Sequence, residues 1–233
     1  MAELPPNVHV SSHPCLLGKL SQLRASTANA RETKALVHEI STIVGCEALA
    51  AGLTTKKGPV AKTPLGYEYT TTTIAPSTIS LVPILRSGLG MLDAVQNLLP
   101  NPVPVHHLGL FREPTTLEPV EYYNNLPYHR PSVGSPSNTP NSDCSELAIL
   151  LDPVIATGGT CAAAIQTLKE WGVKRVIVIA VLGALPGVEK AAQEWPEGVQ
   201  IWLAGLDESI NDRGMIKPGL GDVGDRLFLT IGK

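Results

Sequence analysis

Residues 147–182, LAILLDPVIATGGTCAAAIQTLKEWGVKRVIVIAVL, contain two apolar runs separated by a glycine-rich turn and a helical pattern. The runs at 147–151 and 175–182 are rich in Leu, Ile and Val, which is typical of buried strands. Between them apolar residues recur at helical spacing over 161–168, and Gly172 follows where a helix would end. Units of strand, helix and strand build parallel sheets. The stretch therefore predicts an α/β fold, with a central parallel sheet flanked by helices.

The turn at 156–160, Ala-Thr-Gly-Gly-Thr, has the chemistry of an anion site. Gly158 and Gly159 allow a tight turn that directs several N–H groups to one point, and the threonines add hydroxyl donors. The turn leads into a helix N-terminus, which favours a phosphate. It matches neither the Walker pattern nor GxGxxG. An ordinary strand-to-helix turn is the alternative, but Asp152 at the strand end favours a ligand, because its carboxylate could hold a pair of ribose hydroxyls.

A second strand-turn-helix pattern covers residues 79–98, with Arg86-Ser87-Gly88 at its turn. Arginine offers phosphate a permanent planar fork of donors. An arginine beside Ser-Gly is more often a surface residue. Together with the phosphate-type turn at 156–160, however, it favours a diphosphate-binding role for Arg86.

Composition restricts the classes of function. The 233 residues are 43% hydrophobic and 4% aromatic, which suits one α/β domain with an aliphatic core. A formal net charge of -3 gives no reason to expect nucleic acid or an anionic membrane as a partner. The cysteines lack metal-site spacing, the first residues lack a signal pattern, and the longest apolar run is too short to cross a bilayer. We therefore expect a cytoplasmic protein with reduced thiols.

Other segments surround this domain. Residues 1–14 have the proline-rich, polar composition of an N-terminal tail, 19–49 have a helical pattern, and 67–74 alternate like a strand of a β-ribbon. Residues 118–123 are expected to form the return strand of a protruding hairpin. Residues 127–146 have the composition of a mobile loop, which we interpret as an insertion and not as a domain boundary.

Several charged residues have two possible roles. Arg24 and Arg31 lie in or before the helical region and are interpreted as solvated surface charges. Arg112 follows a predicted strand and could close over a substrate or be a solvated charge on the hairpin. The acidic pair at 207–208 could hold a metal, but a capped loop is the commoner explanation. The glycine-rich segment 215–225 either approaches a ligand with its backbone or simply turns tightly.

Three separate stretches, 150–160, 82–90 and 218–225, resemble the type I phosphoribosyltransferases. The first resembles the phosphoribosyl diphosphate motif, although most of that superfamily carries two adjacent acids where this chain has Asp152 followed by Pro153. The Asp-Pro variant is similar to the uracil phosphoribosyltransferases. The resemblance covers residues 12–233, with the three motifs in the family's order.

The resemblance implies a single domain over 1–233, with a protruding β-hairpin arm and a hood over the base site. It implies the conversion of uracil and 5-phospho-α-D-ribose 1-diphosphate (PRPP) to UMP and diphosphate in pyrimidine salvage, with Mg²⁺ as cofactor. It also implies a homodimer or homotetramer and, as some members have one, a GTP effector bound near the basic residues of the helical region.

The resemblance assigns three groups of site residues. Asp152, Arg86 and Arg112 are implied to be catalytic. Ile216, Gly221, Asp222 and Val223 are implied to bind uracil, and Asp222 could contact substrate-bound Mg²⁺. The residues implied to bind PRPP are Arg86, Arg112, Asp152, Pro153, Val154, Ile155, Ala156, Thr157, Gly158, Gly159, Thr160 and Asp222.

Two alternatives remain open from the sequence. A regulator of the same fold could keep the nucleotide pocket and signal through a partner or RNA, although the chain has no basic stripe. A phosphoribosyltransferase for another base is the second, although the Asp-Pro variant and the Pro-Gly-Leu-Gly-Asp segment at 218–222 disfavour purines.

Overall fold

The computed structural model of the chain describes residues 4–113, 115–116, 118–127 and 144–230, apart from the side chain of Arg112. Its centre is a seven-stranded sheet of strand order β1-β11-β9-β7-β4-β5-β6. Neighbouring strands are parallel from β1 to β5, and β6 pairs antiparallel with β5. The strands are β1 (Val8–Val10), β4 (Ile79–Leu85), β5 (Leu108–Arg112), β6 (Pro119–Asn124), β7 (Leu147–Leu151), β9 (Arg175–Ala180) and β11 (Val199–Leu203).

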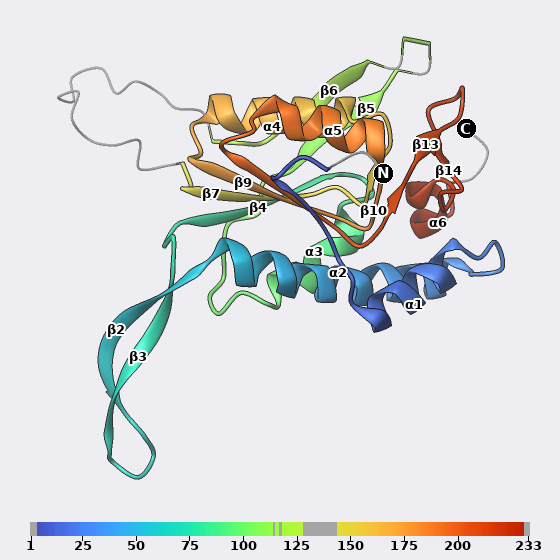
Figure 1. Cartoon of the computed structure of the whole chain (residues 1–233). Helices are drawn as coiled ribbons and strands as arrows, with labels where there is room; N and C mark the ends of the chain where they lie inside the picture. The colour runs from blue at the N-terminus through green and yellow to red at the C-terminus, as the bar shows by residue number, and fades with distance from the viewer. Residues whose placement is uncertain (1–3, 114, 117, 128–143, 231–233) are drawn as a thin grey trace, which may run out of the picture.

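Helices cover both faces of this sheet (Figure 1). On one face lie α4 (Gly159–Trp171) and α5 (Leu185–Glu194). On the other lie α1 (Pro14–Arg24), α2 (Ala30–Gly52) and α3 (Leu89–Gln96). The predicted α/β fold with a mainly parallel central sheet is therefore confirmed.

Strand β7 shows why two helical layers are needed. All five of its residues are buried, and successive side chains point to opposite faces. Ala148 and Leu150 join the core beneath α4 and α5. Leu147, Ile149 and Leu151 join the core against α1, α2 and α3. A strand that is apolar on both faces is stable only when both faces are covered.

The helical pattern at 19–49 is not one helix, because α1 ends at Arg24 and α2 begins at Ala30. The side chain of Asn29 accepts a hydrogen bond from the backbone N–H of Glu32 at 3.1 Å. The Glu32 carboxylate in turn accepts from the Asn29 N–H at 2.9 Å. This capping box fixes the start of α2.

Helix α2 is long and apolar enough to cross a membrane by length and composition alone. Its residues Val37, Ile40 and Val44 are fully buried in the core that contains β4, β7 and β9. The helix is therefore a core element of this fold.

The interpretation of residues 1–14 as a tail is wrong for the part that the structure describes. Val8, His9 and Val10 form β1 and pair with Ile201, Trp202 and Leu203 of β11. The Asn7 side-chain amide donates to the carbonyl oxygens of two residues near that edge, Ala192 and Val199. A three-residue strand carries too little pattern to be recognised in sequence, and its partner strand lies far along the chain.

Several smaller elements lie outside the central sheet. The predicted ribbon at 67–74 is confirmed as one strand of an antiparallel pair that projects away from the molecule (Figure 1). Most of the expected loop at 127–146 lies outside the described residues. The smaller elements are β2 (Thr54–Lys62), β3 (Glu68–Ala75), β8 (Val154–Ile155), β10 (Leu182–Ala184), β12 (Leu206–Asp207), β13 (Ser209–Ile210), β14 (Ile216–Lys217) and α6 (Val223–Phe228).

Candidate functional site

A cavity of about 320 Å³ lies at the carboxyl edge of the central sheet. It is lined by residues that follow β4 and β7, by the end of β5, by the start of α4, and by the segment between β14 and α6. In open α/β sheets ligands bind at this edge, because several strands end there and their loops converge.

The segment between β8 and α4 forms one wall of the cavity. Ala156, Thr157, Gly158 and Thr160 all line it. Gly158 immediately precedes α4 and has a φ of 77°, a left-handed conformation that favours glycine. The free N–H groups at the start of α4 therefore lie beside a glycine turn and two threonine hydroxyls, which is a suitable set of donors for a phosphate.

Asp152 lies at the end of β7, lines the cavity and is only 7% exposed. Burial raises the pKa of this carboxyl group to about 7, although a hydrogen bond from the Val154 backbone acts in the opposite direction. The neighbouring Cys161 thiol has a raised pKa because it is buried and faces Asp152. Below about pH 7 the environment therefore favours a protonated Asp152, unless a ligand supplies hydrogen-bond donors or positive charge.

Arg86 lies in the turn between β4 and α3 and is exposed at the cavity. The Leu85–Arg86 peptide bond is cis. The Arg86 guanidinium donates to the Thr230 hydroxyl at 3.3 Å, and that hydroxyl donates to the Asp225 carboxylate at 2.6 Å. Because Arg86 is exposed and lines the cavity, its guanidinium can bind an anion there.

The segment from β14 to α6, which we call the hood, forms the opposite wall. Ile216, Gly221, Asp222 and Val223 line the cavity. Gly221 has a φ of 79°, so this position also favours glycine. The Asp222 carboxylate caps α6 by accepting the Asp225 N–H at 3.0 Å. The part of the hood that lines the cavity consists of glycine and apolar residues together with one acidic residue, Asp222.

The structure brings most of the sequence-predicted site residues together. Pro153 and Gly159 are part of the same loop but do not line the cavity, and the side chain of Arg112 lies outside the described part of the chain. The predicted residues that line the cavity are Arg86, Asp152, Val154, Ile155, Ala156, Thr157, Gly158, Thr160, Ile216, Gly221, Asp222 and Val223.

Other lining residues were not predicted. Phe111 and Tyr122 of the β5–β6 hairpin lie with their ring centroids 6.1 Å apart and place aromatic surface at the cavity. Only the alternation of side chains along the two strands of the hairpin could have indicated that these two face the cavity. The unpredicted lining residues are Leu85, Ser87, Leu110, Phe111, Tyr122, Cys161, Leu182, Gly214, Met215, Leu220 and Gly224.

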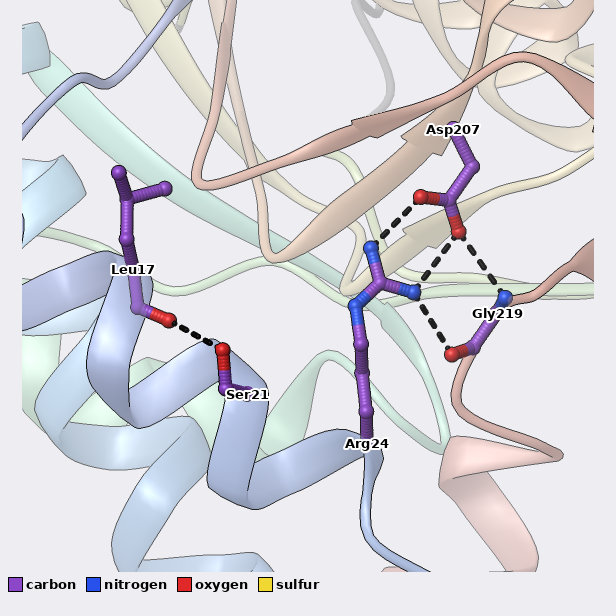
Figure 2. A network of polar contacts seen from close by, with 5 residues as sticks. All are labelled: Leu17, Ser21, Arg24, Asp207 and Gly219. Atoms are coloured by element: carbon purple, nitrogen blue, oxygen red, sulfur yellow. Dashed lines mark hydrogen bonds and ion pairs between the residues drawn. The ribbon is translucent and has the colours of Figure 1, made fainter.

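Arg24 is not the solvated charge that we expected. Its guanidinium forms a two-armed ion pair with the buried carboxylate of Asp207, at 2.6 and 2.8 Å (Figure 2). Asp207 also accepts the Gly219 N–H at 2.9 Å. Asp207 is the last residue of β12 and is held in an ion pair with α1, and is therefore not part of a capped loop. Among the described residues, no group of three or more His, Cys, Asp or Glu side chains could hold a metal.

The sequence and the fold both match known proteins. The family model for uracil phosphoribosyltransferase matches residues 10–230. A uracil phosphoribosyltransferase of Roseiflexus sp. (strain RS-1) is 40% identical over 230 residues, which are 96% of this chain and 98% of that protein. A solved protein structure from Aquifex aeolicus is 29% identical with a TM-score of 0.82, covering 96% of this chain and 98% of its own.

A solved adenine phosphoribosyltransferase of Trypanosoma brucei is similar in fold alone. Its TM-score is 0.51 at 16% identity, and the match covers 92% of this chain and 89% of that one.

Proposed function

Because this chain belongs to the uracil phosphoribosyltransferase family, we propose that the cavity at the carboxyl edge of the sheet is its active site. The protein is a pentosyltransferase of pyrimidine salvage, which converts uracil and PRPP to UMP and diphosphate. The observation that carries the proposal is the meeting of Asp152, the 156–160 turn and the hood around one cavity.

The phosphoribosyl group occupies the side of the cavity formed by β7 and α4. The turn at 156–160 binds the 5′-phosphate through the N–H groups at the start of α4 and the Thr157 and Thr160 hydroxyls. Asp152 accepts hydrogen bonds from the ribose hydroxyls. Substrate binding shifts its equilibrium towards the ionised form, because donors to a carboxylate lower its pKa.

Uracil binds under the hood. Uracil presents alternating donors and acceptors at its edge, and backbone C=O and N–H groups can match this pattern. Gly221 and Val223 offer such groups in a segment held by the start of α6, and the Ile216 side chain offers an apolar wall.

The chemical step needs positioning and charge stabilisation. C1 of the ribose gains positive character as its bond to diphosphate breaks, and N1 of uracil then forms the new bond at C1 and releases its proton. The carboxylate of Asp152 lies on the side where this positive charge develops. Arg86 and Arg112 receive the departing diphosphate, so no side chain has to act as a nucleophile.

Mg²⁺ fits this site as a partner of the substrate. The lining includes the carboxylates of Asp152 and Asp222, and the described residues offer no three-ligand cluster. Mg²⁺ commonly keeps several waters and binds substrate phosphates with few protein ligands. Asp222 is the residue that would contact it, and the ion would neutralise charge on the diphosphate.

The remaining expectations complete the proposal. The enzyme acts in the cytoplasm as a homodimer or homotetramer, and GTP is its effector, bound near the basic residues around α1 and α2. Measurement of molar mass in solution with and without GTP, together with activity at each GTP concentration, tests these points.

The central experiment measures UMP formed from labelled uracil, PRPP and Mg²⁺, for the wild type and for Asp152→Asn. Robust product from the wild type and a loss of about a hundredfold or more in the variant are expected, since one well-placed electrostatic group contributes about that factor. Equal activity of a folded Asp152→Asn would remove Asp152 from the mechanism. Competition by cytosine and by purine bases in the same assay tests the specificity of the hood.

A further inference from the structure

Arg24, Asp207 and Gly219 form a closed polar network between α1 and the hood (Figure 2). Two guanidinium nitrogens of Arg24 donate to the two carboxylate oxygens of Asp207. One of these nitrogens also donates to the Gly219 carbonyl oxygen at 2.8 Å. The Gly219 N–H donates to Asp207 at 2.9 Å. Both polar groups of the Gly219 peptide unit are therefore held, one by each partner of the ion pair.

Gly219 lies in a buried, sharply turned part of the chain, where its backbone groups require hydrogen-bond partners. Gly219 is buried and has a φ of 66°, and a Cβ atom there would lie 2.2 Å from the Ile216 carbonyl oxygen. The chain turns sharply between the two ends of the uracil wall, Ile216 and Gly221. A buried turn requires partners for its backbone groups, and side chains supply them here.

Arg226 holds the next peptide unit in a similar way. Its guanidinium donates to the Leu220 carbonyl at 2.8 Å and to the carbonyl oxygens of Leu23 and Ala25 at 2.6 and 3.2 Å. Arg24 and Arg226 thus tie two successive residues of the hood to the C-terminal end of α1.

Asp207 connects this network to the phosphate side of the cavity. It is the last residue of β12, which pairs with β10, and β10 pairs with β8. Strand β8 leads directly into the turn that precedes α4. A small three-stranded sheet therefore joins the carboxylate that holds the hood to the loop proposed to hold the 5′-phosphate.

We infer that Arg24 and Asp207 are positioning residues. They fix the distance between the proposed uracil-binding residues of the hood and the turn at 156–160. Neither residue lines the cavity, so each acts through Gly219. The inference rests on the proposed uracil site at Ile216, Gly221 and Val223. It gives the helix α1, which contributes no lining residue, a role in the affinity for uracil.

The test separates positioning from stability. Removal of one partner of a buried ion pair leaves an unpaired charge and destabilises the fold, whereas replacement of both by apolar residues is often neutral. We expect Arg24→Met and Asp207→Leu each to lower Tm, and the double variant to regain Tm. All three should raise the KM for uracil by about tenfold, equivalent to about 1.4 kcal/mol, and the KM for PRPP by less than about twofold.

The matched control removes a second ion pair of α1, Lys19 with Glu39, whose side chains are partly exposed. In assays without GTP, Lys19→Met/Glu39→Leu should leave both KM values unchanged. A double Arg24→Met/Asp207→Leu variant that regains both Tm and wild-type KM for uracil would overturn the inference.

Ile216→Ala distinguishes failure of the positioning inference from failure of the proposed uracil site. If this variant raises the KM for uracil while the Arg24 and Asp207 variants do not, only the positioning role is wrong. If it also leaves the KM for uracil unchanged, the proposed uracil site itself is wrong and the positioning inference falls with it.

Discussion

Gly158 and Gly187 lie backbone against backbone, so that a Cβ atom on Gly158 would be 2.1 Å from the Gly187 carbonyl oxygen. Conversely, a Cβ atom on Gly187 would be 2.1 Å from the Ala156 carbonyl oxygen. The loop proposed to bind the 5′-phosphate is thus packed directly against the start of α5. No side chain fits between these two segments, and a methyl group at either position must displace the loop.

Gly187→Ala should therefore weaken PRPP binding although Gly187 does not line the cavity. We expect the KM for PRPP to rise by about tenfold, or about 1.4 kcal/mol, with a lower Tm, since displaced N–H groups bind phosphate less well. Steady-state kinetics with each substrate varied in turn measure this. Gly18→Ala is the control, because a Cβ atom there has open space and alanine favours a helix interior by up to about 1 kcal/mol. An unchanged KM for PRPP in Gly187→Ala would mean that this packing does not position the loop.

Asp152 should make the substrate-free protein less stable as pH rises. Burial raises its pKa from 3.8 to about 7 in the folded chain. Between these two values the folded chain holds a proton that the unfolded chain has released, so the free energy of unfolding falls as pH rises. Above pH 7 both states are ionised and the fall is complete. At about 1.4 kcal/mol per pKa unit, the total is on the order of 4 kcal/mol.

Thermal unfolding of the wild type and Asp152→Asn, measured without substrate across this pH range, tests the prediction. The substitution removes only the Asp152 carboxyl group, and the Cys161 thiol, whose pKa is raised, stays neutral. The Tm of Asp152→Asn relative to the wild type should therefore increase with pH and level off above pH 7. Two parallel curves would show that burial does not perturb this carboxyl group.

The sequence was sufficient for the elements that are decided locally. The two apolar runs around the 156–160 turn have partners within the same short stretch, and glycine at 158 and 172 marks conformations that few other residues adopt. Both glycines have positive φ in the structure, at 77° and 105°. The strand-turn-helix unit and the position of its turn at the cavity could therefore be predicted.

Long-range partners could not be read in the same way. Arg24 and Asp207 are 183 residues apart in the chain, and neither has a local pattern that indicates the other. Strand β1 likewise becomes a strand only by pairing with β11. The break between α1 and α2 is different, because Asn29 and Glu32 have the spacing of a capping box and could have indicated a helix start.

Arg86→Lys should weaken the binding of PRPP and of diphosphate to the same extent. Lysine keeps the charge but loses the planar fork that binds phosphate through two parallel hydrogen bonds. We expect the KM for PRPP and the inhibition constant of diphosphate to rise about tenfold, with little change in the KM for uracil. The same substitution at the exposed Arg31 is the control. If only the KM for uracil changed, Arg86 would contribute to uracil binding and not to diphosphate binding.

Arg112→Ala should lower turnover more than it changes either KM. We propose that this side chain stabilises charge that forms only as the diphosphate departs, and a group of that kind lowers kcat when it is removed. Turnover should fall about tenfold for each 1.4 kcal/mol of transition-state stabilisation lost. Single-turnover rates with pre-bound substrates measure the step directly. An unchanged single-turnover rate would exclude Arg112 from the chemical step.

Asp222 has two separable roles, one structural and one proposed for the substrate. Its carboxylate caps α6 at Asp225, and an alanine there should cost about 1 kcal/mol of stability. Serine and asparagine also cap helices well, so Asp222→Ser and Asp222→Asn should keep a Tm close to that of the wild type. Neither carries a negative charge for Mg²⁺, and hence both should lose activity as severely as Asp222→Ala. Thermal unfolding and UMP formation across the three variants separate the two roles, because a serine variant with full activity would show that this residue serves only as the cap.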